Sequence, residues 1–234
     1  MQIEDFSNGF DVLCSSFSAT ADFGKDAPAN APVFNEHEKS VYLTKAQEEL
    51  VISLYTGKNS NGDSFESSEE IRRYLSPLIK TDRLDPISTT SGLPLGVDSN
   101  SKFFTLPLDC WFITYESIDV TDSSCEVLSS IEVYPVKQDE YHRIRKNPFR
   151  GANSHRALRL DLSDGVIEIV SKYNAISYYL RYLRKLKPII LCKLDDDSAI
   201  NDTTDPSECE LHESLHQRIL ELAVTMALQS KRTS

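Results

Sequence analysis

The hydrophobic period of this 234-residue chain changes twice along its length. Near both ends, apolar residues recur every three to four positions, which is the spacing of an amphipathic helix. Between residues 102 and 191, aromatic and β-branched residues alternate or form short runs, as they do in strands. We therefore expect an α+β fold with N-terminal helices, a central and mainly antiparallel sheet, and a long C-terminal helix.

The first 33 residues are predicted to form a helix followed by an extended arm. Residues 18–33 are small, polar and rich in proline, which is typical of a linker. Such an arm can cross to a neighbouring subunit or lie on its own surface, and the sequence leaves both open. We expect the helix and arm over residues 1–33 and a single α+β domain over residues 34–234. The helix is predicted over residues 3–17 from the helical spacing of Ile3, Phe6, Phe10, Leu13 and Phe17.

Residues 34–57 are the clearest helical stretch. Asn35 stands where an N-cap is expected, and Gly57 is a natural left-handed stop. Thr44 and Gln47 have the spacing of a second capping box. The stretch is therefore predicted to be two short helices or one kinked helix.

The pattern of the next segment predicts another helix and then strands. Ser67 and Glu70 form a further capping box, and Pro77 is expected to kink or shorten the helix. Asp164-Gly165 predicts a hairpin turn. A short helix is expected over 138–147. The predicted strands are residues 102–120, 126–136, 156–162, 166–171 and 189–191. The period of residues 175–185 is ambiguous, and residues 176–180 within them fit a strand.

The last segment is predicted to be an acidic loop and one long helix. Residues 195–207 are rich in aspartate and lack the spacing of a calcium-binding loop. Residues 208–231 are predicted to form the helix. Within it, residues 219–228 are apolar almost all round, so this part is expected to be buried in a core or between subunits.

The charge of the chain is unevenly distributed. The net charge is −11, yet residues 137–193 hold thirteen Lys and Arg and five Asp and Glu. This block is +8, which leaves −19 for the remainder. A basic block in an acidic chain favours docking onto an acidic surface, including that of another copy. The alternative is a solvated basic face without a partner.

Several classes of protein are disfavoured by the sequence. No run of eighteen apolar residues is present, so we expect no transmembrane helix, and the acidic N-terminus does not resemble a secretory signal. The five cysteines are odd in number and include no C-x-x-C pair, which favours thiols in a reducing compartment. Phosphate-binding glycine loops and the G-x-S-x-G elbow of hydrolases are also missing.

Residues 212–216, HESLH, match the H-E-x-x-H pattern of zinc metallopeptidases. On a helix, His212 and His216 share a face and can bind one zinc ion, and Glu213 can act as the general base. A catalytic site needs a third ligand, and the only later acid, Glu221, cannot reach the same metal without breaking the helix. We therefore predict neither a metal site nor catalytic residues, and keep a zinc metallopeptidase as an alternative.

The basic stretches also contain aromatic residues, which raises a second alternative. Lys and Arg side chains can neutralise phosphates, and tyrosines can stack on bases. A nucleic-acid-binding regulator that uses residues 137–193 is therefore considered. The acidic remainder of the chain argues against a free DNA-binding protein.

Most of the chain, roughly residues 34–230, resembles the neck proteins of crAss-like tailed bacteriophages. These are ring-forming adaptors that join the portal to the tail. The resembling stretches carry no catalytic signature, and they are VFNEHEKSVYLTKAQEELV, EYHRIRKNPFRG, ALRLDL, YYLRYLRKLKPIIL and ELHESLHQRILELAVTMAL.

The resemblance implies a non-enzymatic structural protein of the virion, located in the neck or tail, that needs no cofactor. It implies a homo-oligomeric ring, commonly of twelve copies, that contacts the portal protein and other neck or tail ring proteins. Such a ring encloses the DNA channel without sequence-specific binding and assembles in the bacterial host cytoplasm. In similar adaptors the closing helices meet the portal, which makes residues 208–230 candidates here.

The basic block is the place where we expect subunit or portal contacts. Its cations suit side-to-side contacts with an acidic neighbour, and heterologous contacts of this kind close into rings. The candidate interface residues are Arg143, Arg145, Lys146, Arg150, Arg181, Tyr182, Arg184 and Lys185.

Overall fold

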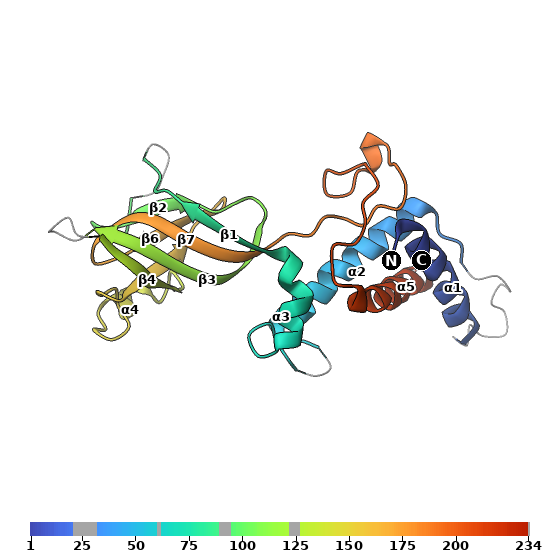
Figure 1. Ribbon diagram of the computed structural model, residues 1–234, viewed down its shortest axis with the longest axis horizontal. Helices are drawn as coiled ribbons and strands as arrows, with labels where there is room; N and C mark the ends of the chain where they lie inside the picture. The colour runs from blue at the N-terminus through green and yellow to red at the C-terminus, as the bar shows by residue number, and fades with distance from the viewer. Residues whose placement is uncertain (21–31, 60–61, 89–94, 122–126, 234) are drawn as a thin grey trace. The chain divides into compact units, whose positions relative to one another are not determined.

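The computed structural model describes residues 1–20, 32–59, 62–88, 95–121 and 127–233. The chain divides into two compact units (Figure 1). The helical unit comprises residues 1–78 and 186–234, and the sheet unit comprises residues 79–185. Within the helical unit, residues near the N-terminus pack with the C-terminal helix, and the division at residue 33 stays a prediction. Most of the predicted arm, residues 21–31, lies outside the described residues.

The helical unit is built around three helices, α1 (Ile3–Thr20), α2 (Glu36–Thr56) and α5 (His216–Thr233). α5 packs against both α1 and α2 (Figure 1). Phe6 and Phe10 of α1 are buried, as their helical spacing predicted, and so are Ile219 and Val224 of α5. Within the described residues, no helix is long and apolar enough to cross a membrane.

α2 is one continuous helix. Asn35 caps it, with its side chain accepting the Glu38 N–H and the Glu38 side chain accepting the Asn35 N–H, and Gly57 ends it at φ 75°. The predicted second capping box is wrong, because both side chains face an adjacent segment of the unit. Thr44 Oγ1 lies 3.1 Å from the N of Ile189, and Gln47 Nε2 donates to a main-chain carbonyl of the same segment at 2.7 Å.

This adjacent segment is residues 187–191, of which residues 189–191 were predicted as a strand and do not form one. Its only ladder contact among the described residues is a single bridge between Ile190 and Ser207. Several of its other backbone groups bind side chains of α2, as when the N–H of Leu191 donates to Ser40 Oγ at 3.0 Å, whereas the Lys187 N–H donates to Glu210 and the Pro188 carbonyl accepts the Ser207 hydroxyl. The α2 hydroxyls and amide therefore replace a neighbouring strand.

Two helix boundaries differ from their predictions. α3 (Glu69–Leu75) is capped by Ser68 rather than Ser67, and it continues into a 3₁₀ turn, η1 (Ser76–Leu78), at the predicted proline. α5 begins at His216 after a 3₁₀ turn, η3 (Glu213–Leu215), so the predicted start at residue 208 is wrong. The Nδ1 atom of His212 accepts the Ser214 N–H at 3.3 Å, and this cap starts the turn.

The sheet unit contains one seven-stranded sheet in the order β1-β7-β3-β4-β5-β6-β2 (Figure 1). All neighbours are antiparallel except β4 and β5, so the predicted α+β class with a mainly antiparallel sheet is confirmed. The strands are β1 (Ile79–Leu84), β2 (Lys102–Thr105), β3 (Cys110–Thr121), β4 (Val127–Pro135), β5 (Arg156–Asp161), β6 (Val166–Val170) and β7 (Asn174–Arg184).

Two features of the sheet were not predicted. The expected single strand over 102–120 is two strands, because a turn at Pro107 sends β2 to pair with β6 and β3 to pair with β4 and β7. β1 was missed because its sequence, IKTDRL, lacks an apolar alternation. The predicted hairpin of β5 and β6 is confirmed, with Asp164 at φ 57° and Gly165 at φ 71° in the turn.

The sheet curls around an apolar cluster on its inner face. The centroid of the Phe104 ring of β2 lies 5.5 Å from that of the Tyr178 ring of β7. β2 is the last strand of the sheet and β7 is the second, so this contact brings strands from opposite ends of the sheet together. On the outer face, α4 (Tyr141–Arg145) buries Tyr141 and Ile144 in a second apolar cluster with residues of β5 and β6. Alternation along β5 divides its side chains between the two faces.

The inner face also buries an ion pair. Arg159 Nη1 lies 2.6 Å from Glu116 Oε1, and the Tyr178 hydroxyl donates to the other carboxylate oxygen at 2.7 Å. Burial raises the pKa of Glu116, and the guanidinium of Arg159 opposes this rise. Burial also raises the pKa of Tyr178, so its hydroxyl remains a donor.

Candidate functional site

The predicted interface cations lie on two different elements of the sheet unit. Arg143, Arg145 and Lys146 belong to α4 or its C-terminal cap, and Arg150 follows on the next turn. Arg181, Arg184 and Lys185 lie on β7 or just after it. α4 covers β5 and β6, whereas β7 pairs with β1 and β3, so the structure divides the predicted set in two.

Neither unit has a positive net charge, although the sheet unit contains most of the basic block. The sheet unit holds 14 Lys and Arg and 14 Asp and Glu, so its formal charge is zero. The helical unit holds the other 11 Lys and Arg and 22 Asp and Glu, and therefore carries the whole net charge of −11. Cations on the sheet unit thus act as local groups rather than as part of a strongly basic domain, which gives the nucleic-acid alternative no further support.

The α4 group is exposed, and its cations are paired to different degrees. Arg143 pairs with Glu140 at 3.2 Å, and Arg145 with Asp98 at 3.1 Å. Lys146 and Arg150 are exposed. The exposed ion pairs contribute little to stability and leave these side chains available to a partner.

The β7 group alternates between the two faces of the sheet. Arg181 is exposed on the outer face, whereas Tyr182 is only 1% exposed. Its hydroxyl oxygen lies 2.9 Å from Asp82 and 3.0 Å from Asp109, and burial raises its pKa. Lys80, 2.6 Å from Asp109, lowers the pKa of that carboxyl. Tyr182 therefore fixes the strands that carry the exposed cations instead of presenting its own ring.

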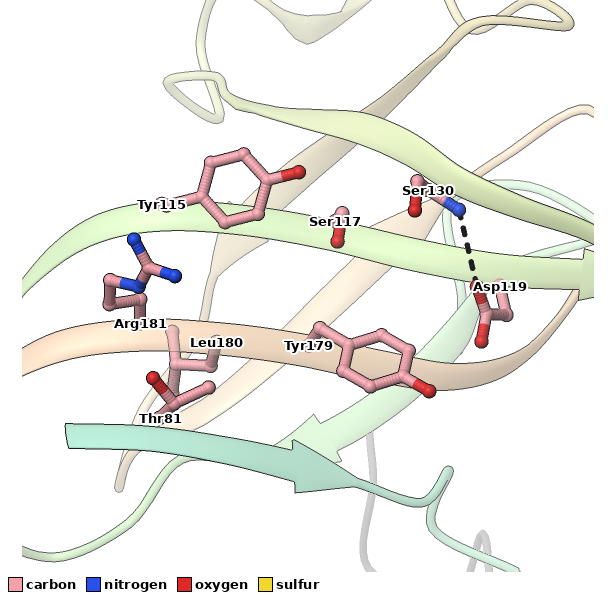
Figure 2. A pocket seen from close by; sticks show the side chains of 8 residues that line it. All are labelled: Thr81, Tyr115, Ser117, Asp119, Ser130, Tyr179, Leu180 and Arg181. Carbon is pink, nitrogen blue, oxygen red and sulfur yellow. Dashed lines mark hydrogen bonds between the residues drawn. The ribbon is translucent and has the colours of Figure 1, made fainter.

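A hollow of about 340 Å³ opens on the outer face where Arg181 lies (Figure 2). Tyr115 is the cross-strand partner of Arg181, and the guanidinium carbon lies 6.0 Å from the tyrosine ring. Arg83 of β1 stands 5.1 Å from the ring of Tyr179. The residues that line the hollow are Thr81, Tyr115, Ser117, Asp119, Ser130, Tyr179, Leu180 and Arg181.

A β-bulge shapes one end of this hollow. Ser130 has φ 61°, and the register between β3 and β4 shifts beside it. Asp119 stabilises the bulge by accepting the Ser130 N–H at 3.2 Å, as Figure 2 shows, and by accepting the Ser177 hydroxyl at 3.2 Å. This carboxylate is 8% exposed and already bound, so the accessible groups of the hollow are guanidinium and hydroxyl groups. Such groups suit a carboxylate-bearing side chain of a partner.

The HESLH stretch does not bring its two imidazoles to one helix face. His212 lies before the 3₁₀ turn, and His216 is the first residue of α5. His216 is 4% exposed, with Nε2 3.0 Å from the Leu211 carbonyl oxygen and Nδ1 3.0 Å from the Met1 amine. Across the described part of the chain, no three His, Cys, Asp or Glu side chains are grouped to hold a metal ion. The geometry that the peptidase alternative requires is therefore not formed.

Two of the thiols are also poorly suited to nucleophilic chemistry. Burial raises the pKa of both Cys110 and Cys209 to about 11. A thiol with such a pKa is protonated near neutral pH, and the thiolate is the nucleophile.

Comparison with known proteins decides the family. The family described as phage tail ring protein 3/4 matches residues 1–234. The chain belongs to the phage tail ring protein 3/4 family. The match includes the first 33 residues, which the predicted resemblance left out.

Relatives of this ring protein include two from Bacteroides phage crAss001. The protein named Ring protein 3 is 44% identical over 234 residues, which cover 99% of this chain and 96% of the relative. The protein named Ring protein 4/5 is 30% identical over 236 residues, which cover 97% and 92%. The predicted resemblance to structural proteins of crAss-like phages is confirmed. A phage tail ring protein is a component of the virion.

Several residues of the outer face were not identified from the sequence as site candidates. Tyr115 and Tyr179 were assigned only to strands, and Arg83 lies in a strand that was missed. A period-two signal was present, because positions 115, 117 and 119 and positions 177, 179 and 181 are polar or aromatic. Only the pairing of β3 with β7 shows that these two rows lie side by side.

Proposed function

We propose that this chain is a non-enzymatic ring subunit that connects the portal to the tail of a crAss-like phage. The observation that supports it is a match over the whole chain to a tail ring family, with relatives named as ring proteins. The ring consists of copies of the chain, commonly twelve, stacks on the portal and other neck or tail ring proteins, and encloses the DNA channel. It is assembled in the host cytoplasm and becomes part of the virion neck or tail.

Subunit contacts are assigned to the cations of both groups, of which Arg184 is half-buried and the others are exposed: Arg143, Arg145, Lys146, Arg150, Arg181, Arg184 and Lys185. Their neighbours in a ring would be acidic, and the helical unit carries all of the net negative charge. Tyr182 contributes by holding β7 in place. Residues 208–230 are proposed to approach the portal.

The test is native mass spectrometry of the purified chain, alone and with its portal. The expected result is a closed ring, and twelve copies would have twelve times the 26.4 kDa of one chain. A chain that stays monomeric both alone and with the portal would contradict the ring. Because side-to-side charge pairs are screened by salt, the ring should weaken at high ionic strength.

A charge-reversal pair tests the assigned residues. Arg181→Glu is expected to reduce ring formation by about ten-fold or more, since it places an acid opposite an acidic neighbour. Lys137→Glu is the matched control, because Lys137 is an exposed cation of the same block outside the assigned set. Equal rings from both variants would remove Arg181 from the interface.

A further inference from the structure

The turn after α4 holds a large apolar side chain in solvent. Phe149 is 85% exposed. Its backbone is nevertheless fixed: Asn147 Oδ1 accepts the N–H of Phe149 at 2.9 Å and that of Arg150 at 3.2 Å. Arg156 Nη1 donates to the Phe149 carbonyl oxygen at 3.0 Å. The phenyl ring is exposed on a turn whose backbone is held by hydrogen bonds. Binding of a partner would therefore cost little backbone conformational entropy.

The base of the turn is equally constrained. Gly151 donates its N–H to the Asn147 carbonyl oxygen at 2.8 Å. A Cβ at Gly151 would lie 2.9 Å from that oxygen and 3.2 Å from the Arg145 carbonyl oxygen, so a glycine is required there. The helix before the turn is anchored in its apolar cluster by Tyr141 and Ile144.

The surroundings of Phe149 are strictly basic in sequence. Residues 141–160 contain no Asp or Glu. Arg143, Lys146 and Arg150 are exposed around the turn. A partner for this turn therefore needs an apolar hollow with an acidic rim.

The helical unit has a hollow of this kind. It measures about 240 Å³ and lies between the C-terminal half of α2, α3 and η3. Its lining includes the apolar residues Leu54, Ile71 and Leu215 and the carboxylates of Asp63 and Glu70, and Arg218 is the cation among the lining residues. The Glu70 carboxylate also accepts the Tyr74 hydroxyl. A cavity of about 150 Å³ holds a benzene molecule, so a phenyl ring fits in this volume.

We propose that the Phe149 turn of one copy inserts its ring into this hollow on the helical unit of the next copy. The two surfaces differ, so the contact is heterologous and repeats from copy to copy, which is the symmetry of a ring. Charge complementarity favours this occupant, because the turn is basic and the helical unit carries the net charge of −11. The inference rests on the proposed ring function and names one of its subunit contacts.

A photo-crosslinking experiment on the full chain tests this contact. Phe149 is replaced by p-benzoylphenylalanine, which keeps an aromatic side chain, and the cross-linked peptides are mapped after irradiation. Cross-links are expected to residues 50–59, 62–74 or 214–218 of a second copy. The same analogue at Val127, an exposed apolar position of β4, is the control and should not label these segments. Labelling elsewhere, or none, in a chain that forms rings overturns this contact and leaves the ring function standing. A chain that forms no ring overturns both.

A truncation measures how much the contact contributes. Phe149→Ala is expected to weaken ring association by about ten-fold or more, as for a buried aromatic anchor. Leu108→Ala is the matched control, because Leu108 is 92% exposed and lies outside the turn. Unchanged association in Phe149→Ala, or an equal loss in Leu108→Ala, would overturn the proposal.

Discussion

The helical unit and the sheet unit differ in how they bury a charge. In the sheet unit, Arg159 and Glu116 are both almost inaccessible to water. Arg159 also pairs with the exposed Asp161, but the carboxylate of Glu116 has Arg159 as its cation. In the helical unit, the amine of Lys39 is buried, but its partners Asp11 and Glu36 reach the solvent. The helical unit can therefore lose its cation and leave its acids hydrated, whereas the sheet unit cannot.

The two units can be followed by different signals. Trp111 is the only tryptophan of the chain and lies in β3, so its fluorescence reports on the sheet unit. The longest helices belong to the helical unit, so circular dichroism at 222 nm reports mainly on that unit. A substitution in one unit is expected to shift the signal of that unit more than the signal of the other.

The largest effect is expected from removing the buried guanidinium. Arg159→Met should destabilise the sheet unit by about 3–5 kcal/mol, because Glu116 is left in the core without a cation. Urea unfolding followed by tryptophan fluorescence measures this loss. The loss should shrink as the pH falls, since a protonated Glu116 needs no partner.

The matched control in the other unit is Lys39→Met, which is expected to cost about 0–1 kcal/mol in the circular dichroism transition. If Arg159→Met and Lys39→Met lost equal free energies of unfolding, the two units would not differ in how they bury a charge. A shift of both signals by Arg159→Met would instead mean that the two units unfold together.

A smaller effect is expected at the first turn of α2. Asn35→Ala removes the cap that accepts the Glu38 N–H at 2.7 Å and should destabilise the helical unit by about 1 kcal/mol. Glu49→Ala, at an exposed position inside the same helix, is the control and should stay within about 0.5 kcal/mol of the parent. If Asn35→Ala instead lowered the stability measured by tryptophan fluorescence, the cap would not act on the helical unit alone.

The smallest effect is expected from protonation of His216. Burial lowers the pKa of His216 below its usual 6.5, so the unfolded chain takes up this proton at a higher pH than the folded chain. The helical unit should therefore lose stability as the pH falls from about 6.5 towards the folded-state pKa.

Circular dichroism transitions recorded at several pH values check this sign. The slope should be smaller in His216→Gln, and the tryptophan transition should show no such difference between the two proteins. A slope that is unchanged in the variant would assign the pH dependence to other groups.

Local signals predicted much of the fold correctly. Asn35 and Gly57 bound α2 because capping and a left-handed stop act within a few residues of the helix end. Asp164-Gly165 turns the β5–β6 hairpin for the same reason. The phage structural family was also identified from the resemblance of several sequence stretches, and the family match confirms it.

Other signals were overruled by contacts between distant segments. Thr44 and Gln47 have the spacing of a cap, but the chain near residue 189 supplies partners that keep α2 continuous. Residues 189–191 look like a strand, but their partners are side chains of a helix, since backbone groups need only a donor or an acceptor.

The candidate site shows the same division. The number and type of its cations were available in the sequence, and Arg143, Arg150 and Arg181 are exposed where a partner can reach them. Only strand pairing placed Arg181 beside Tyr115, turned Tyr182 inward to Asp82 and Asp109, and separated the α4 group from the β7 group. The formal net charge is a sum over residues, so it is the same in every fold. Which side chains share one surface depends on which strands are neighbours, and long-range packing decides the order of the strands.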